Sequence, residues 1–400
     1  MPTNPEEIGG KQGTGNMRVG IIGLGYRLAY LARVFTAARS DFEIVGYVDP
    51  APAGLPYTKE HGVSVGKQYD SLEALIDNGN LDLLMVGSPN HMHLEHIRIG
   101  LERGMKLFAE KPVVTSVEDT MAIAELIGQY GSDNVMVGLV LRYAPLYVDL
   151  RKAQAEGKLG NIASIEASET IPPYHGAFFM RDWRRYGRYS GSFMLEKCCH
   201  DLDLYNGVMG CRPRYVASFG GRRSFVPENA PQVSGVNDLE VYHRKPSGWM
   251  GSDKVFDSDG DIIDFQTALV QYENGAALTF HTNLNVADDF RRFAVIGAKG
   301  MAEGDFVRNY FKVTDSRTSD RLEDKTYEVS SLSSHYGADE QMAEDILKHL
   351  VDGAPLPVSV VDALEAGLLA LSMDEAMRNK SVVDMGPIWQ RFDAALGRQG

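Results

Sequence analysis

Glu110-Lys111-Pro112 is the short segment of this chain with the clearest chemical potential. It follows the apolar run 105–109 and lies about 85 residues after a glycine turn, Gly23-Leu24-Gly25. A lysine ammonium at the end of a strand can donate a hydrogen bond to a reacting hydroxyl and stabilise the negative charge that develops on its oxygen. Lys111 is therefore the first candidate catalytic residue, with Glu110 beside it.

A second candidate group lies in segment 196–203, Glu-Lys-Cys-Cys-His-Asp-Leu-Asp. On a helix, Glu196, His200 and Asp203 are spaced i, i+4 and i+7 and share one face, where a carboxylate can orient an imidazole. Such a histidine can take a proton from an alcohol near neutral pH. The alternative is an amphipathic helix whose acidic side meets water. Together with Lys111, the spacing predicts His200 as a general base and Glu196 as the residue that orients it.

The glycine turn indicates how a cofactor could be brought to these residues. Gly23 and Gly25 follow a β-branched run and precede a helical pattern, a setting in which backbone amides and a helix N-terminus bind a pyrophosphate. Tyr26 and Arg27 are expected beside it. Leu28 stands where a third glycine is usual, which predicts a slightly wider separation of helix and strand. A turn without any nucleotide is the alternative.

Asp49 bears on the choice of dinucleotide. It ends the second apolar run, about 25 residues after the glycines, where a carboxylate can accept hydrogen bonds from the adenine ribose. The following Pro50-Ala51-Pro52 offers no arginine for a 2′-phosphate. The sequence thus predicts NAD in preference to NADP, with a turn or cap aspartate as the alternative.

A polar segment with several histidines follows the apolar run 81–87. Loops at the carboxyl ends of parallel strands face the ligand crevice. We therefore expect further cofactor contacts from Ser88, Pro89, Asn90, His93, Glu110 and Lys111. For His93 and His96, capping or surface positions are the alternative. Because the spacings of His91, His93 and His96 do not place all three on one helix face, no metal site is predicted.

The first part of the chain alternates short apolar runs with helical patterns. The apolar runs are 17–23, 43–49, 81–87, 105–109 and 135–141. Strands buried on both faces have this character, because helices cover a parallel sheet above and below. Residues 17–141 are therefore predicted to form an NAD-binding Rossmann domain, a doubly wound parallel sheet of the α/β class. Residues 1–16 are polar and are predicted to be a disordered tail.

The pattern changes after residue 141. Alternating or aromatic-rich runs follow at 162–170, 265–272, 276–282, 292–297 and 306–313. They predict that residues 142–400 form an α+β domain with a large, mostly antiparallel sheet, open on one face. Helices are expected near 339–350 and 361–378, and a long loop over 227–261. This domain would bind substrate, and its open face favours a homodimer or homotetramer.

Composition narrows the class of protein. A chain of 400 residues exceeds what one hydrophobic core usually supports, so two domains are expected. The formal net charge of -14 argues against nucleic acid as a partner. Three cysteines are too few for a disulfide framework, and the first sixteen residues contain no apolar segment of membrane-spanning length. We expect a cytoplasmic protein without a membrane partner.

Aromatic and basic side chains precede the histidine segment, in Arg181-Asp182-Trp183-Arg184-Arg185-Tyr186. Aromatic faces suit the apolar side of a pyranose, and arginine suits a carboxylate, sulfonate or phosphate. An anionic sugar is one hypothesis; the alternative is that these arginines are solvated or paired with acidic residues. The candidate substrate-binding residues are Arg142, Tyr143, Tyr174, Trp183, Arg184, Lys197, His200 and His335.

In combination, these segments resemble the Gfo/Idh/MocA family of NAD(P)-dependent sugar and polyol oxidoreductases. The resemblance spans residues 17 to about 378. Its further segments are Tyr272-Glu273-Asn274-Gly275, Ile296-Gly297-Ala298-Lys299-Gly300 and His335-Tyr336-Gly337-Ala338-Asp339. It implies a Rossmann domain followed by an α/β domain whose open sheet often mediates oligomerisation. By resemblance, Lys111 hydrogen-bonds the reacting hydroxyl and His200 is the acid/base; the family often has aspartate where Glu196 stands.

Three functions are compatible with these residues. The first is NAD-dependent oxidation of a CH-OH group in a sugar, sugar acid or polyol by hydride transfer. The second is NAD-dependent glycoside hydrolysis, in which transient oxidation, elimination, addition of water and return of the hydride leave no net redox change. Its substrate could be a sulfonated or carboxylated glycoside. The third is a non-catalytic cofactor sensor, which Lys111 and His200 disfavour.

Overall fold

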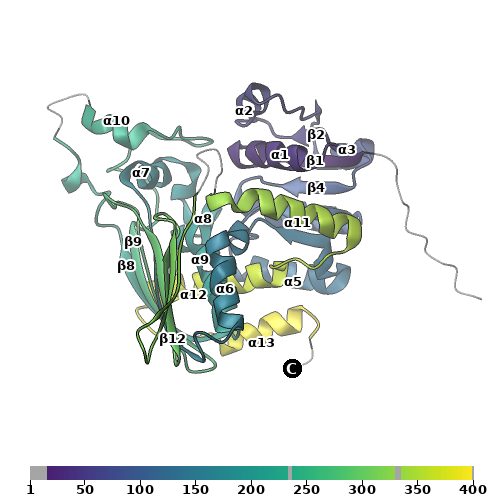
Figure 1. Cartoon of the computed structure of the whole chain (residues 1–400). Coiled ribbons are helices and arrows are strands. Elements are labelled where there is room, and N and C mark those ends of the chain that lie inside the picture. Colours follow the sequence, from purple (N-terminus) through teal and green to yellow (C-terminus); the bar gives the residue numbers. More distant parts are fainter. Residues whose placement is uncertain (1–15, 233–236, 329–334, 399–400) are drawn as a thin grey trace, which may run out of the picture.

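The structure of the chain, a computed structural model, describes residues 16–232, 237–328 and 335–398. It contains two sheets with helices packed between and around them (Figure 1). The predicted tail 1–16 lies outside the described residues except for its last residue.

The first sheet is parallel throughout, in the order β3-β2-β1-β4-β5-β6. Its strands are β1 (Met17–Ile22), β2 (Phe42–Val48), β3 (Lys67–Gln68), β4 (Leu83–Val86), β5 (Lys106–Ala109) and β6 (Val135–Val137). Its helices are α1 (Tyr26–Ala38), α2 (Leu55–Glu60), α3 (Leu72–Gly79), α4 (His93–Glu102) and α5 (Val117–Tyr130). Every residue of β4 is buried, as expected for a strand covered by helices on both faces. The predicted doubly wound parallel sheet is confirmed.

The second sheet has nine strands in the order β14-β13-β12-β11-β7-β10-β9-β8-β15. Its pairs are antiparallel except β7 with β10. The strands are β7 (Ile162–Thr170), β8 (Pro213–Gly221), β9 (Phe265–Tyr272), β10 (Ala277–Asn283), β11 (Arg291–Gly297), β12 (Gly300–Asp305), β13 (Tyr310–Asp315), β14 (Arg321–Thr326) and β15 (Val383–Asp384). The predicted large, mostly antiparallel sheet is confirmed.

The strand prediction over 306–313 is wrong in its first part. Phe306 follows β12, and the next strand begins only at Tyr310. β12 itself was not predicted, because its sequence, Gly-Met-Ala-Glu-Gly-Asp, has little strand propensity. The packing explains one of its glycines: a Cβ at Gly304 would lie 2.8 Å from Cζ of Phe293 on β11.

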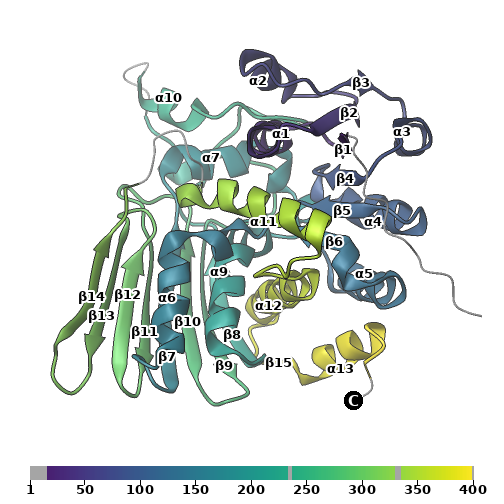
Figure 2. The ribbon, with the colours of Figure 1, turned by 45° about the vertical axis from the view of Figure 1, so that its right-hand side comes forward.

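Helices of the second part lie between the two sheets (Figures 1 and 2). They include α6 (Pro145–Ala155), α9 (Phe193–Met209), α11 (Ala338–Asp352) and α12 (Val360–Asn379). The two predicted C-terminal helices are confirmed as α11 and α12, and α13 (Gly386–Ala395) follows them without having been predicted. α11 packs against α1 and α12 against α9, so the C-terminal segment contacts both halves of the molecule.

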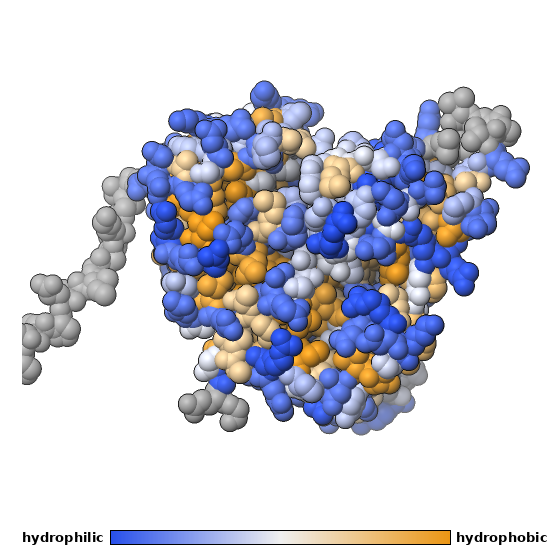
Figure 3. Space-filling model, turned by 180° about the vertical axis from the view of Figure 1, so that it is seen from behind, coloured by the Kyte–Doolittle hydropathy of each residue, from blue (hydrophilic) through white to orange (hydrophobic). Residues whose placement is uncertain are grey.

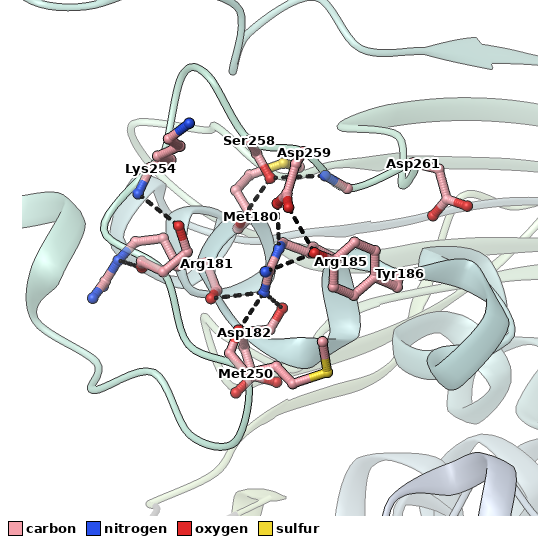
Figure 4. A network of polar contacts seen from close by, with 12 residues as sticks. Met180, Arg181, Asp182, Arg185, Tyr186, Met250, Lys254, Ser258, Asp259 and Asp261 are labelled. Atoms are coloured by element: carbon pink, nitrogen blue, oxygen red, sulfur yellow. Dashed lines mark hydrogen bonds and ion pairs between the residues drawn. The ribbon is translucent and has the colours of Figure 1, made fainter.

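A long insertion separates β8 from β9. It contains α10 (Asn237–His243), which was not predicted within the long loop 227–261, and otherwise little regular structure. It packs on α7 (Pro173–Arg181) and a following 3-10 turn (Trp183–Arg185). Buried Arg185 anchors it by donating to the Met250 carbonyl (2.6 Å) and to the Asp259 carboxylate (2.7 Å) (Figure 4).

Within the described ranges, no helix is both long and apolar enough to cross a membrane.

Candidate functional site

The glycine turn between β1 and α1 has the geometry of a pyrophosphate site. Gly23 has φ +85°, and a Cβ there would lie 2.3 Å from the Ser88 backbone nitrogen, so this position requires glycine. A Cβ at Gly25, by contrast, would meet no atom within 4 Å. Gly25 caps α1 with no side-chain bond. The open space at the N-terminus of α1 therefore suits a phosphate group.

Leu28, in the place of a third glycine, packs over Gly87 at the end of β4. A Cβ at Gly87 would lie 2.4 Å from Leu28 Cγ. In the usual pattern, a glycine on the helix lets the helix lie close to the sheet. Here Gly87, just after β4, leaves the room for Leu28 on the helix.

Asp49 directly follows β2, the strand beside β1. Its Oδ1 accepts the Ala51 N–H (2.8 Å), so one carboxylate oxygen has the turn-forming role considered as the alternative. The residue stands at the strand end where a ribose is bound in doubly wound folds. These features, with the glycine turn, fit NAD.

His93 connects the loops after β4 and β5. Its Nε2 lies 2.8 Å from the Ser88 carbonyl oxygen and its Nδ1 3.0 Å from that of Pro112. His96 lies with Nδ1 2.8 Å from Ser88 Oγ. Both imidazoles are buried, which contradicts the alternative of surface positions, and burial lowers the pKa of His96 to about 4. His93 thus fixes the two loops that border the crevice.

Arg27 and Glu110 form a bridge between the halves of the molecule. Arg27 Nε donates to Glu110 Oε1 (2.8 Å), and its Nη2 donates to Asp339 Oδ1 at the start of α11 (2.7 Å). His335 Nδ1 lies 3.0 Å from the other oxygen of Asp339. Tyr26, the neighbour of Arg27, is 58% exposed. The contacts of Glu110 and Arg27 therefore position the Lys111 loop.

Lys111 brings the two predicted chemical groups together. Its Nζ donates to the backbone carbonyl of Glu196 (2.7 Å) and lies 3.8 Å from Oε1 of the same residue. The end of β5 therefore meets the first turn of α9. Lys111 keeps 19% of its side chain exposed.

His200 lies one turn further along α9 and is buried. Within the described chain its Nδ1 has no hydrogen-bond partner. Burial, and then the charges of Lys111 and Arg291, hold the pKa of His200 well below its usual value. The imidazole is therefore neutral at neutral pH and able to accept a proton.

The expected orientation of His200 by Glu196 is not found. The Glu196 carboxylate accepts hydrogen bonds from Asn90 Nδ2 and from Arg184 Nε (2.8 Å), and no described bond joins it to His200. Asp203, on the same predicted face, is bound by Arg142. The face argument failed because α9 is buried nearly all round. Each polar side chain therefore meets a different neighbour.

The predicted substrate-binding residues separate into two groups. Tyr174, Arg184, Lys197 and His200 lie around α7 and the start of α9, and Trp183 packs under the Arg184 guanidinium at 4.3 Å. The ring of His335 lies 6.0 Å from that of His200. Arg142 and Tyr143 belong elsewhere. Arg142 lines a separate cavity of about 650 Å³ beside α6 and α12, and Tyr143 is buried in the core.

Sequence reasoning missed two residues of the insertion that reach this area. Lys245 Nζ lies 5.9 Å from the Tyr174 ring, and the Trp249 ring stacks on His91 of the β4 loop at 6.2 Å. The basic pair Arg244-Lys245, in a segment rich in glycine and aspartate, was the available signal. Among the residues that the structure describes, no group of histidine, cysteine, aspartate and glutamate is arranged to hold a metal ion.

Comparison with known proteins agrees with this architecture. Residues 17–139 match the NAD-binding Rossmann fold of the Gfo/Idh/MocA oxidoreductase family, and residues 151–385 match its C-terminal alpha/beta domain. The putative oxidoreductase YteT of Bacillus subtilis is 23% identical over 87% of this chain and 91% of its own length. Myo-inositol 2-dehydrogenase of Thermotoga maritima is 24% identical over 92% and 98%.

A solved structure of levoglucosan dehydrogenase in complex with NADH and levoglucosan has a TM-score of 0.74 at 18% identity, covering 93% of this chain and all of that one. The two domain matches together extend over most of the chain. With the glycine turn, Asp49 and the Lys111 loop in place, the protein is an NAD-dependent oxidoreductase and belongs to the Gfo/Idh/MocA family.

Proposed function

We propose that this protein oxidises a CH-OH group of a sugar, sugar acid or polyol by hydride transfer to NAD, with Lys111 and His200 at the reacting hydroxyl. The observation that carries the proposal is the position of the Lys111 ammonium, bound to the first turn of the helix that holds a neutral, buried His200. The substrate class is supported by the names of the relatives, which include myo-inositol and levoglucosan dehydrogenases.

In this reaction the alcohol loses a proton from oxygen and a hydride from carbon. Bound NAD supplies the hydride acceptor. His200 takes the hydroxyl proton, a contribution on the order of 10² to 10⁴ in rate for a positioned base. Lys111 donates a hydrogen bond to the same oxygen and stabilises the alkoxide as the proton leaves. The CH-OH group becomes a carbonyl group, and His200 releases its proton to solvent.

In this proposal Glu196 positions Lys111 and pairs with Arg184. It does not orient His200. Burial raises the pKa of its carboxyl, but the charges of Lys111 and Arg184 outweigh this and leave the pKa below its usual value. The ionised carboxylate and the Glu196 carbonyl thereby hold the ammonium of Lys111 beside the crevice.

The test is turnover of Lys111→Ala on a panel of sugars and polyols, followed by NADH absorbance. We expect turnover to fall on the order of 10²-fold or more, because the alkoxide loses its cation, while NAD affinity measured by calorimetry stays within about threefold. Lys106→Ala, at the other end of β5, is the matched control. Unchanged steady-state turnover of Lys111→Ala would remove the lysine from the mechanism.

The same panel separates the alternative functions. Release of aglycone from aryl glycosides without net NADH, together with exchange of sugar C-H for solvent deuterium, would indicate redox-neutral glycoside hydrolysis. Binding of NAD with neither reaction, on a panel that includes anionic sugars and glycosides, would indicate a cofactor sensor.

A further inference from the structure

We propose that Lys245, Lys197 and Arg184 form an anion-binding subsite beside the Lys111 centre, and that the substrate carries a carboxylate, sulfonate or phosphate group. This inference deepens the proposed function and rests on it. Its new element is Lys245, which lies in the insertion between β8 and β9.

Two cations flank one aromatic ring in this subsite. Lys245 Nζ lies 5.6 Å and Arg184 Cζ 5.7 Å from the centroid of the Phe178 ring on α7. Lys245 Nζ also lies 5.9 Å from the ring of Tyr174. Ring faces attract cations, so α7 gathers positive groups from two separate segments at one place.

Lys197 connects these cations to the reaction centre. It stands on α9, next to Glu196 and three positions before His200. After burial, the charge of Lys197 is the largest influence that lowers the pKa of Lys245, and it also lowers that of His200. The Lys197 ammonium is therefore within electrostatic reach of both residues, and an anion bound by it would lie near the reacting carbon.

Two of the three cations of this group have carboxylate partners among the described side chains, and Lys245 has none. Arg184 is paired with Asp182 and Glu196, and Lys197 with Glu169 (2.9 Å). For Lys245, none of the described side chains supplies a carboxylate. A partly buried ammonium beside two other cations is costly, and an anionic substrate group would offset that cost.

The neighbouring His175 supports the same conclusion. Burial, followed by the charges of Lys197, Lys245, Lys111 and Arg184, holds its pKa well below the usual value. The imidazole is uncharged at neutral pH and stacks on Tyr174 at 6.2 Å. It offers a hydrogen-bonding group among the cations without adding charge.

The backbone that carries Lys245 is held on both sides. Buried Arg181 donates from Nη1 to the carbonyls of Tyr242 (3.1 Å) and Lys245 (3.2 Å). Asp182 Oδ2 accepts the N–H of Gly248 (3.1 Å). Arg181 and Asp182 belong to the anchoring network of the insertion (Figure 4). The position of Lys245 is thus fixed by buried groups, as a binding residue requires.

The test compares anion binding by the NAD-loaded wild type and Lys245→Met. The anionic probes are D-glucuronate, 6-deoxy-6-sulfo-D-glucose, D-glucose 6-phosphate, myo-inositol 1-phosphate and inorganic phosphate. Neutral D-glucose and myo-inositol are the uncharged controls. We expect at least one anion to bind the wild type about 10-fold more tightly than Lys245→Met in calorimetry, since one ammonium contact to an anion is worth roughly that factor. A difference below about twofold for every anion would overturn the proposal.

Two variants serve as controls. Lys245→Arg keeps the cation and is expected to retain the anion preference within about threefold. Lys254→Met removes an exposed lysine of the same insertion and should leave anion binding unchanged. Loss of the preference in Lys254→Met as well would assign the effect to the net charge of the insertion and overturn the role of Lys245.

A pH series on the sulfonated sugar supplies an independent readout, because the sulfonate does not titrate in this range. Burial, then Lys197 and Arg184, lower the pKa of Lys245 to about 8. The groups facing it are Lys197 on α9, Arg184 after α7, and Tyr174 and His175 on α7. As pH rises from 7 to 9, Lys245 loses its charge, so affinity should fall in the wild type and not in Lys245→Met. A parallel fall in both would overturn the assignment.

These results distinguish the two proposals. Oxidation of neutral and anionic sugars at equal efficiency, with no effect of Lys245→Met on binding, would leave the proposed dehydrogenase standing and remove the anion subsite. Anion binding that depends on Lys245 without any turnover would retain the subsite and contradict the proposed function.

Discussion

His200 is placed where burial, and then nearby positive charge, makes protonation unfavourable. Its neighbours Lys111, Lys197 and Arg291 are cations, and its own side chain is buried. A base with a lowered pKa stays unprotonated at neutral pH, although each proton it accepts must be released quickly. The environment therefore keeps His200 ready for the forward reaction without an adjacent carboxylate.

This environment predicts the pH dependence of oxidation. Because the pKa of His200 lies well below its usual value of 6.5, the imidazole is neutral above that value and becomes protonated only at lower pH. We expect kcat/KM for a neutral sugar or polyol to be flat from pH 6.5 to 7.5 and to fall only below pH 6.5. The measurement is the initial rate of NADH formation against pH; an acidic limb at or above pH 7 would contradict the assignment.

At the residue scale, the sequence motifs singled out Lys111 and His200, and their catalytic roles stay predictions. The structure places Lys111 against Glu196 on the first turn of α9, one turn before His200. Glu196 was predicted to orient His200 and instead binds Asn90 and Arg184. Spacing along a helix reveals which residues share a face, but it does not reveal what packs against that face. Lys245 was missed, since an irregular insertion has no periodicity from which its contacts could be inferred.

At the scale of elements, uniform burial made the first sheet predictable. Strands such as β4 are apolar throughout because helices cover both faces. The second sheet was harder toward both edges: β8 and β15 on one side were not predicted, and neither were β12, which is rich in glycine, and β14, which reads Arg-Leu-Glu-Asp-Lys-Thr, on the other. A charged edge strand avoids association with other chains, and such a strand lacks the apolar alternation on which a prediction depends.

The connection between β1 and α1 allows two glycines to be tested against each other. Gly23→Ala places a Cβ 2.3 Å from the Ser88 nitrogen at φ +85°, so the free energy of unfolding should fall by about 1–3 kcal/mol. Gly25→Ala meets nothing within 4 Å and should leave stability within about 0.5 kcal/mol. It should instead weaken NAD binding, because the methyl group enters the space predicted for the pyrophosphate.

Urea denaturation and NAD calorimetry on the two variants provide the measurements. Equal destabilisation by both substitutions, or unchanged NAD affinity in Gly25→Ala, would contradict the pyrophosphate position.

At the scale of the whole molecule, one face of the second sheet is uncovered. In Figures 1 and 2 the helices lie on the other side of its central strands. The strand register places Tyr215, Phe219, Leu269 and Ile296 on the uncovered face, where Phe219 is 68% and Leu269 58% exposed. The rear of the molecule also shows apolar surface, in separate patches among hydrophilic side chains (Figure 3).

The exposed face of the sheet predicts self-association into a homodimer or homotetramer. Phe219→Glu should shift the protein toward the mass of a single chain in light scattering, because a charge on this face opposes its burial. Val351→Glu, which replaces an exposed valine of α11, is the matched control. A wild type with the mass of a single chain would contradict the prediction.

The ion pairs of Arg27 bear on how NAD enters and leaves the protein. The arginine binds Glu110 of the first half and Asp339 of the second, and both carboxylates are buried. Hinging the halves apart would leave at least one of these carboxylates without its cation, at a cost of several kcal/mol. The two halves are therefore expected to stay together through the catalytic cycle, so that NAD enters and NADH leaves without their separation.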